Sequence, residues 1–196
     1  MPEQRMTFHN EIVPHVDAAF NLAWWLLRNK QDAEDAVQEA FLRAFRFFGD
    51  FWGGNGRAWL LKIVRNICYT WLQQNRTQPS KVEFDEEFFV SGLSELNPEL
   101  NLLRNDKRKQ LSMALEALSP HFREVLVLRE LEGLSYKQIS EVAEIPFGTV
   151  MSRLSRARGE LREYFVALSR DFFSTAAGAY RHQRPATKQT IGEEDC

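Results

Sequence analysis

Apolar residues recur at helical intervals through the first third of this chain, in three runs separated by turns and by a cluster of glycines. The first run covers residues 8–27, and Pro14 indicates a kink or a separate first turn inside it. The second run opens at Asp32 with an acidic first turn and stops at Gly49, and the third covers residues 57–74. We therefore predict three helices, each with one apolar face, that share one core.

The middle of the chain lacks sustained periodicity. Residues 77–105 contain two prolines, a glycine and an acidic-aromatic run at residues 83–89, so we interpret this segment as a flexible acidic linker. Beyond it, apolar spacing predicts a helix that ends near Pro120, another that ends at Gly133, and two shorter helices. Residues 171–196 are predicted to form a flexible tail.

The two shorter helices have the signature of a helix-turn-helix. Ser135 and Gln138 fit a capping box, in which the serine hydroxyl and the glutamine side chain satisfy exposed amides at a helix start. Residues 145–148 then break the helix, and Thr149 is suited to cap a second helix beginning at Val150. This arrangement predicts two helices joined by a tight turn.

The second of these helices is amphipathic in a way that suits DNA. Opposite its apolar stripe lie small polar residues and an arginine, and two further arginines flank the stripe: Ser152, Ser155, Arg156, Gly159, Arg153 and Arg158. Small hydroxyls allow close approach to base edges, arginine binds guanine through two hydrogen bonds, and flanking arginines suit phosphates. The alternative is an amphipathic surface helix with solvated arginines, but the capped helix and tight turn before it favour DNA reading.

Charge is distributed unevenly along the chain. The net charge of −2, taken alone, argues against a nucleic-acid partner, but residues 77–105 hold six acidic and two basic residues. The flanking segments are basic, with a net charge of +1 over residues 1–76 and +2 over residues 106–170, and residues 171–196 carry −1. The acidic average therefore reflects the linker more than the helical segments.

Several classes of protein are excluded or disfavoured. The longest wholly apolar run, residues 22–27, is far shorter than the ~20 residues of a membrane span, and the N-terminus is too polar for a signal peptide. We expect a cytoplasmic protein with no direct membrane insertion. The two cysteines, Cys68 and Cys196, have neither disulfide-framework nor metal-ligand spacing.

An enzyme is also disfavoured. One helix carries four clustered carboxylates, which are Asp32, Glu34, Asp35 and Glu39, but a carboxylate-bridged metal bundle needs histidine partners and no Glu-x-x-His pair occurs. No phosphate-cradling glycine loop or nucleophile elbow is present. We therefore expect no catalytic residues, no metal, no cofactor and no small-molecule substrate.

Three motifs carry a family resemblance. They read DAEDAVQEAFLRAF at residues 32–45, WLLKIVRN at residues 59–66, and LSYKQIS followed by GTVMSRLSRAR at residues 134–140 and 148–158. In this order they resemble the sigma-70 superfamily of bacterial RNA polymerase sigma factors, specifically the extracytoplasmic-function (ECF) group. The resemblance extends over roughly residues 6–165.

The resemblance implies an all-α fold of two small helical domains. Residues 1–76 would form a sigma region 2-like domain that binds core polymerase and the minus-ten element. Residues 77–105 would be the acidic linker, and residues 106–170 a sigma region 4-like domain with the helix-turn-helix on the minus-thirty-five element. Residues 171–196 would remain a tail.

The resemblance also assigns site residues. The core polymerase-binding positions are Asp35, Gln38 and Glu39. The minus-ten positions are Asn55, Arg57, Lys62, Arg65 and Asn66, the first two in a glycine-rich loop that would capture an unstacked base. The minus-thirty-five positions are Thr149, Met151, Ser152, Arg153, Ser155, Arg156 and Arg158. Met151 and Ser155 stand where some members have a basic and an aromatic residue, so the promoter sequence does not transfer.

The resemblance implies that the protein directs transcription initiation. Its partners would be core RNA polymerase, promoter DNA and an anti-sigma factor that occludes the polymerase-binding surfaces. The competing interpretation is a one-component regulator, with residues 1–76 sensing a ligand and residues 106–170 binding an operator as a dimer. The aromatic, glycine-rich segment at residues 51–59 beside Lys62 and Arg65 favours capture of a single strand.

Overall fold

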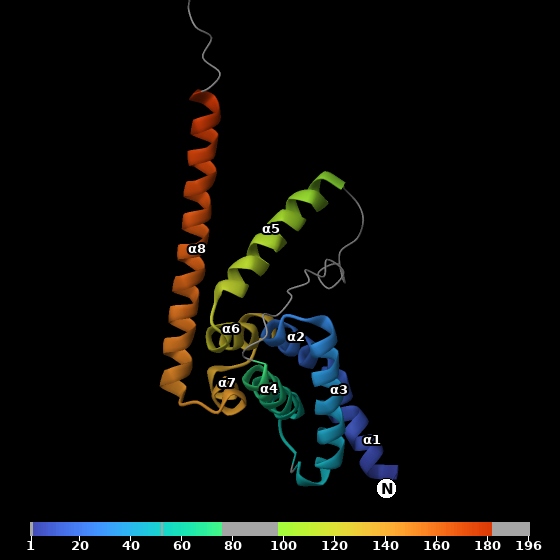
Figure 1. Cartoon of the computed structure of the whole chain (residues 1–196). Coiled ribbons are helices and arrows are strands. Elements are labelled where there is room, and N and C mark those ends of the chain that lie inside the picture. The colour runs from blue at the N-terminus through green and yellow to red at the C-terminus, as the bar shows by residue number, and fades with distance from the viewer. Residues whose placement is uncertain (1, 52, 76–97, 182–196) are drawn as a thin grey trace, which may run out of the picture. The chain divides into compact units, whose positions relative to one another are not determined.

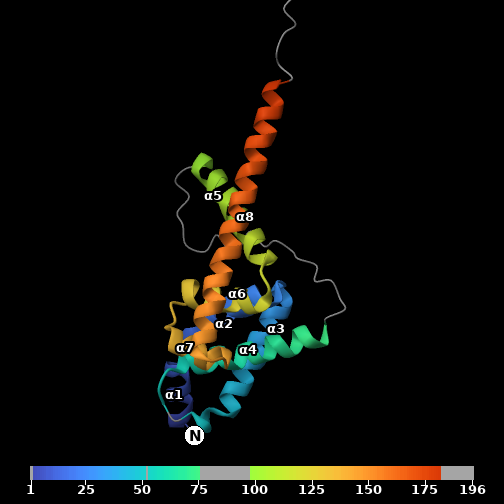
Figure 2. The ribbon, with the colours of Figure 1, turned by 90° about the vertical axis from the view of Figure 1, so that its left-hand side faces the viewer.

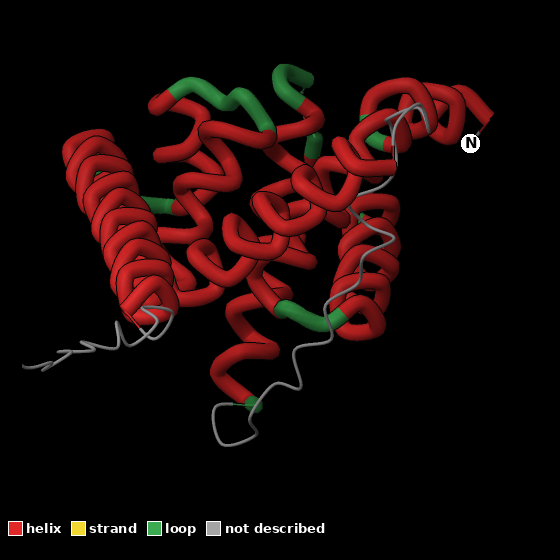
Figure 3. The backbone as a smooth tube through the Cα atoms, turned by 90° about the horizontal axis from the view of Figure 1, so that it is seen from above, coloured by secondary structure: helices red, strands yellow, loops and turns green. Residues whose placement is uncertain are grey.

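The computed structural model describes residues 2–51, 53–75 and 98–181 of the chain, and these residues form helices and connecting turns (Figures 1 and 3). None of the described residues is in a β-strand, which confirms the predicted all-α class. The chain divides into two units, residues 1–161 and residues 162–196, and the contacts described below lie within the first.

The first half of the chain contains four helices: α1 (Pro2–Glu11), α2 (Val16–Leu27), α3 (Lys30–Arg46) and α4 (Gly56–Gln74). A short 3-10 turn at Val13–His15 separates α1 from α2, as Pro14 predicts. Helices α2, α3 and α4 pack against one another, and their apolar faces form the predicted common core. Burial of these faces, rather than helix propensity, supplies most of the stability of such helices.

Asparagine side chains cap two of these helices. Asn29 accepts a hydrogen bond from the Asp32 amide (3.0 Å), so α3 begins at Lys30, two residues before the predicted start at Asp32. Asn55 caps α4 in the same way through the Ala58 amide (3.1 Å). Behind this second cap, a Cβ atom on Gly56 would lie 2.6 Å from the Glu11 carbonyl oxygen, so only glycine allows α1 and α4 to approach this closely.

The second half contains α5 (Pro98–Ala117), α6 (Pro120–Leu126), a π-helical segment (Val127–Leu131), α7 (Tyr136–Ala143) and α8 (Phe147–Arg181). Helix α5 begins at Pro98, inside the segment interpreted as a linker, because proline is well tolerated at a first helical position. The acidic run at residues 83–89 lies outside the described residues. Helix α8 continues to Arg181, so the first part of the predicted tail is helical (Figure 2).

The predicted helix-turn-helix is present, with one correction. Both hydrogen bonds of the capping box form, from the Gln138 amide to Ser135 Oγ (3.3 Å) and from the Ser135 amide to Gln138 Oε1 (2.8 Å). Helix α7 ends at Ala143, and the C-cap residue Glu144 adopts a left-handed conformation at φ 53°. The prediction that Thr149 caps α8 is wrong, because α8 begins at Phe147 and the Thr149 amide already donates to the Pro146 carbonyl (2.8 Å).

The two halves of the chain share one hydrophobic core. Buried residues from Phe8 to Ala157 form a single cluster to which both halves contribute. Helix α4 packs against α7, and α2 packs against α6 (Figure 1). The segments predicted as separate domains are therefore in extensive contact.

Candidate nucleic-acid interface

The predicted polymerase-binding residues lie on the outer face of α3. Asp35, Gln38 and Glu39 are all exposed. Asp35 accepts a hydrogen bond from Gln31 Nε2 (3.3 Å), and Glu39 forms an ion pair with Arg43 one turn later. Both interactions are local to the helix, so the carboxylates remain accessible to a partner.

Beside these residues is an apolar groove of about 610 Å³ that sequence reasoning did not identify. Its lining side chains come from α1, α2 and α3 and are mostly apolar: Phe8, Val16, Asp17, Phe20, Glu34, Val37, Gln38, Phe41, Leu42 and Phe45. Leu42 is 63% exposed and Phe45 47%. Phe45 continues the apolar face predicted for the helix that opens at Asp32, but the neighbouring helices leave this part of the face exposed. Exposed apolar surface with acidic residues at its edge is typical of a protein-binding site.

The glycine-rich loop before α4 adjoins a smaller pocket of about 280 Å³. Gly53 and Gly54 have φ values of +86° and +106°, which favour glycine. The Asn55 side-chain oxygen is engaged in capping α4, although the residue is exposed. Phe51 and Trp59 also line the pocket, with ring centroids 5.1 Å apart. Such rings provide a platform on which an unpaired base can stack.

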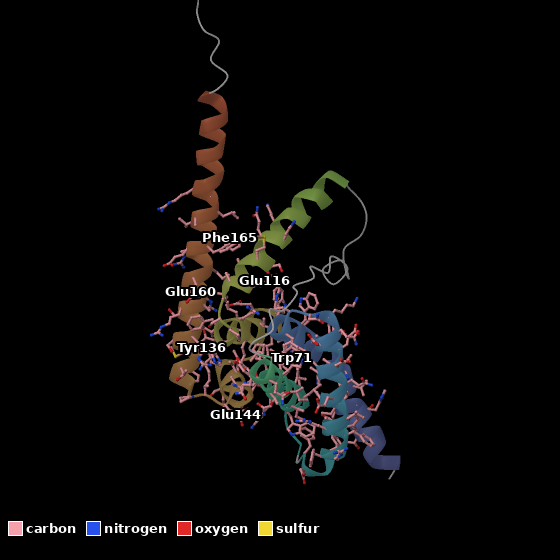
Figure 4. The ribbon with its side chains drawn as sticks, viewed as in Figure 1. Trp71, Glu116, Tyr136, Glu144, Glu160 and Phe165 are labelled. Carbon is pink, nitrogen blue, oxygen red and sulfur yellow. The ribbon has the colours of Figure 1, made fainter. Side chains whose placement is uncertain are left out.

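The cations of α4 are paired with glutamates from the second half of the chain. Lys62 Nζ lies 2.9 Å from Oε1 of Glu144. Glu144 directly follows the last residue of α7 and is labelled in Figure 4. Arg65 Nε donates to Glu124 Oε1 at 2.6 Å, and its Nη1 atom lies 3.9 Å from Glu144 Oε2.

Two more residues complete this face of α4. Arg57 pairs with Glu132. The exposed Asn66 accepts a hydrogen bond from Arg65 Nη1 (3.1 Å). The structure therefore gathers the five predicted minus-ten residues on α4 and its loop, with all three cations neutralised by distant carboxylates.

The pair between Arg65 and Glu124 sits in a buried aromatic setting. Glu124 is fully buried and also accepts a hydrogen bond from the Tyr69 hydroxyl (2.9 Å). The Arg65 guanidinium lies 4.6 Å from the centre of the Tyr69 ring, and that ring stacks on His121. Burial, followed by the charge of Glu124, raises the pKa of Tyr69 far above its usual value, so the phenol stays protonated.

The predicted minus-thirty-five residues lie in different environments on α8. Met151, Ser152, Ser155 and Arg156 are exposed, Thr149 is half-buried, and Arg158 is exposed but pairs with Glu130 (2.6 Å). Arg153 is half-buried, and its Nη1 atom is buried without a hydrogen-bond partner among the described residues. Among these seven residues, Arg156 is the exposed arginine that has no ion pair within the described part of the chain, and it lies near two small hydroxyls.

Other kinds of site lack support in the part of the chain that the structure describes. It contains no cluster of three or more histidine, cysteine or carboxylate residues able to hold a metal ion. It contains no helix with the length and apolar character needed to cross a membrane. Burial raises the pKa of the Cys68 thiol to about 12, which makes this cysteine unreactive at neutral pH.

Comparison with known families identifies both halves of the chain. Residues 12–78 match Sigma-70 region 2, and residues 108–161 match Sigma-70, region 4. The order and the extent of the two matches agree with the helices described above.

Individual relatives and a solved structure agree. The chain is 34% identical over 164 residues to the ECF RNA polymerase sigma factor SigE of Mycolicibacterium smegmatis, which covers 83% of this chain and 63% of that relative. It is 37% identical over 134 residues to the ECF RNA polymerase sigma-E factor of Escherichia coli, covering 65% of this chain and 70% of that one. The structure of the sigma factor RpoE of Bartonella quintana in complex with the anti-sigma factor NepR is similar, with a TM-score of 0.63 at 29% identity, covering 81% of this chain and 96% of that one.

Proposed function

We propose a function on the premise that this chain belongs to the sigma-70 superfamily and, within it, to the ECF RNA polymerase sigma factors. Members of this family are transcription initiation factors rather than catalysts. We propose that the chain binds core RNA polymerase, recognises minus-ten and minus-thirty-five promoter elements, and directs initiation without catalysing a reaction itself. The observation that carries the proposal is the presence of both sigma regions, in order, on one chain.

The outer face of α3 supports a role in polymerase binding. Asp35, Gln38 and Glu39 stand beside the apolar groove, so one surface offers both hydrophobic contact and polar contacts at its edge. We propose that a basic-edged surface of core polymerase docks there. The acidic residues would set orientation and association rate, and the groove would supply most of the affinity.

The α4 surface supports a role in holding the minus-ten element as a single strand. Arg57, Lys62 and Arg65 supply cations for phosphates, and Asn55 and Asn66 supply polar groups for base edges. The rings of Phe51 and Trp59 supply stacking. This combination of charge and aromatic surface suits an opened strand better than an intact duplex.

The helix-turn-helix supports reading of the minus-thirty-five element in duplex form. Met151, Ser152, Ser155 and Arg156 form its exposed face, which we propose enters the major groove. Arg158 and Arg153 would contact phosphates beside it, and Thr149 lies at the start of the same helix. We propose residues 1–76 and 106–170 as the two functional domains.

We also propose regulation by an anti-sigma factor. The similar structure of RpoE contains the anti-sigma factor NepR, and the apolar groove of this chain is open to a protein partner. The proposed site of action is the cytoplasm, where polymerase and promoter DNA meet.

The decisive experiment is run-off transcription with purified core polymerase on fragmented genomic DNA, with and without this protein. We expect new transcripts with defined starts only when both are present. A protein that bound a specific duplex tightly as a dimer and never gave a transcript would instead be the one-component regulator. The small net charges of the helical segments lead us to expect weak duplex binding by the free chain.

A further inference from the structure

The face of α8 that is proposed to enter the major groove carries a methionine among its polar residues. Met151 is 50% exposed on this face. Its neighbours Ser152, Ser155 and Arg156 are exposed as well. A methionine side chain has no hydrogen-bond donor, and its thioether sulfur is only a weak acceptor. The exposed surface of Met151 therefore suits an apolar group on the partner.

The middle of this face consists of small residues. At about 100° per residue, Met151 and Arg156 lie about 140° apart around the helix. Four small residues lie between them: Gly148, Ser152, Ser155 and Gly159. A Cβ atom on either glycine would have no contact within 4 Å among the described residues beyond its own stretch of helix, so internal packing does not require glycine there. Small residues allow a partner surface to approach the helix closely, which brings the two longer side chains at the edges into contact with it.

The polar groups of the face offer few hydrogen-bond donors. The hydroxyl of Ser152 donates to the Thr149 carbonyl (3.1 Å), so its hydrogen is used within the helix. Arg156 is exposed and has no ion pair within the described part of the chain, and its guanidinium is suited to bidentate contact with guanine. The face thus combines one strong donor with one apolar side chain.

The chemistry of base edges indicates what Met151 can recognise. The major groove presents acceptors, amino donors and a single apolar group, the C5 methyl of thymine. Contact of Met151 with the polar groups would displace water without replacing its hydrogen bonds, which is unfavourable. Contact with the thymine methyl buries apolar surface on both sides, and the flexible methionine chain can adjust to the shape of the methyl.

The spacing along α8 limits where such a thymine lies. Met151 and Arg156 are five residues apart, which corresponds to about 7.5 Å along the helix axis. This length is about two base-pair steps of 3.4 Å. The pair contacted by Met151 should therefore lie within about three base pairs of the pair contacted by Arg156.

We propose that Met151 is a specificity-determining residue that selects an A·T pair of the minus-thirty-five element through the thymine methyl. This inference rests on the proposed function, in which α8 reads that element in the major groove. The element would then contain a G·C pair selected by Arg156 and, close to it, an A·T pair selected by apolar contact with Met151.

Removal of one methyl group from the DNA tests the proposal directly. Deoxyuridine keeps the hydrogen-bonding groups of thymidine and lacks only the C5 methyl. The probe is a fluorescein-labelled duplex carrying a promoter found by run-off transcription, in which each thymine of the minus-thirty-five element is replaced in turn. Affinity is measured with the full-length chain in complex with core polymerase. We expect one replacement, within about three pairs of the position relaxed by Arg156→Ala, to weaken binding about fourfold, the size expected for one buried methyl group.

Substitutions of the protein assign this effect to Met151. Met151→Ala shortens an exposed side chain in a helix, so the fold should persist. It should weaken binding to the thymine duplex about as much as deoxyuridine does, and it should abolish the effect of that replacement. Met113→Ala removes a methionine of α5 that is 49% exposed, and this control should keep the full deoxyuridine effect. Met151→Arg should transfer the preference at this pair from A·T to G·C.

The possible outcomes separate the inference from the function on which it rests. Tolerance of deoxyuridine at every thymine, or equal sensitivity of the unsubstituted chain and Met151→Ala, would overturn the proposal. A general loss of affinity in Met151→Ala with undiminished deoxyuridine sensitivity would assign Met151 to a protein contact and would also overturn it. If no promoter is found, or no complex with polymerase forms, the proposed function fails and the inference with it, before any deoxyuridine is introduced.

Discussion

The outer face of α3 and the basic face of α4 lie on neighbouring helices, but their charges are satisfied in different ways. On α3, Glu39 pairs with Arg43 four residues away and stays half exposed. On α4, Arg65 pairs with Glu124, 59 residues away and fully buried. The face of α3 is therefore open to a partner, whereas the basic face of α4 is covered by acidic residues of the second half.

Among the substitutions considered, the largest loss of stability is expected at Arg123, which joins the two halves of the chain. Arg123→Ala would remove four hydrogen bonds from a buried guanidinium to backbone carbonyls, one of which belongs to the other half of the chain. We expect a loss of ~3–5 kcal/mol in the free energy of unfolding, measured by urea denaturation. The exposed Arg156→Ala is the control and should change stability by less than ~0.5 kcal/mol. Similar values for the two variants would mean that Arg123 does not anchor the halves.

The contrast between α3 and α4 is tested by one substitution on each side. Glu124→Gln weakens a buried charged contact and should cost ~2–3 kcal/mol of stability, whereas Glu39→Gln weakens an exposed pair and should cost less than ~0.5 kcal/mol. Both are read from chemical denaturation of the full-length chain. If the two costs were equal, the distinction between a covered and an open face would fail.

A similar contrast occurs between two arginines of α8. Arg156 is exposed without a described ion pair, whereas Arg158 is held by Glu130. With polymerase bound, Arg156→Ala should cost ~1–3 kcal/mol and relax preference at one upstream promoter position. Arg158→Ala should weaken all promoters alike and by less, because its charge is already partly neutralised. Competition binding on a set of single-base promoter variants distinguishes these outcomes, and identical profiles would refute the assignment.

The open face of α3 should tolerate substitution in the free chain but not in the complex. Asp35→Ala with Gln38→Ala should weaken core polymerase binding about tenfold, while the circular dichroism spectrum stays unchanged. The exposed pair Gln73→Ala with Gln74→Ala, at the end of α4, is the matched control. Unaltered affinity of the first variant in a titration with labelled polymerase would mean that these α3 residues are only solvated.

The smallest effect is expected at the exposed ion pair between Lys62 of α4 and Glu144. A hydrogen bond from Lys62, and then its charge, lower the pKa of Glu144, with Arg65 acting in the same direction. Because the folded-state pKa lies below the unfolded value of 4.5, the pair stabilises the folded chain above that pH, and this stabilisation is lost as the pH falls through the lowered pKa. Lys62→Met should raise the pKa of Glu144 toward 4.5 in a carboxyl NMR titration. An unchanged pKa would show that the two side chains are apart in solution.

Local signals predicted much of the fold. The kink at Pro14 and the capping box of Ser135 and Gln138 are present, because both depend on residues within a few positions of each other. The acidic first turn predicts that α3 starts at Asp32, whereas the structure places the cap at Asn29. Phe45 continues the apolar face of this helix but is 47% exposed, because periodicity shows which face of a helix is apolar and not how much of it is covered.

The site was predictable only in part, for a physical reason. The residues that α3 and α4 present follow from helical spacing and family resemblance. The glutamates that cover α4 do not, because Glu124 and Glu132 lie 59 and 75 residues from their partners Arg65 and Arg57. In the sequence they are acidic residues of a second helical segment, and only tertiary packing shows what they face.

Carboxylate footprinting with glycine ethyl ester reads both faces in one experiment. We expect Asp35 and Glu39 to be labelled in the free chain and protected when core polymerase binds, because they lie exposed on α3. We expect Glu124 and Glu132 to be protected in the free chain, because they are buried against α4. Labelling of Glu124 and Glu132 in the free chain, or unchanged labelling of Asp35 and Glu39 in the complex, would overturn this distinction between an open and a covered face.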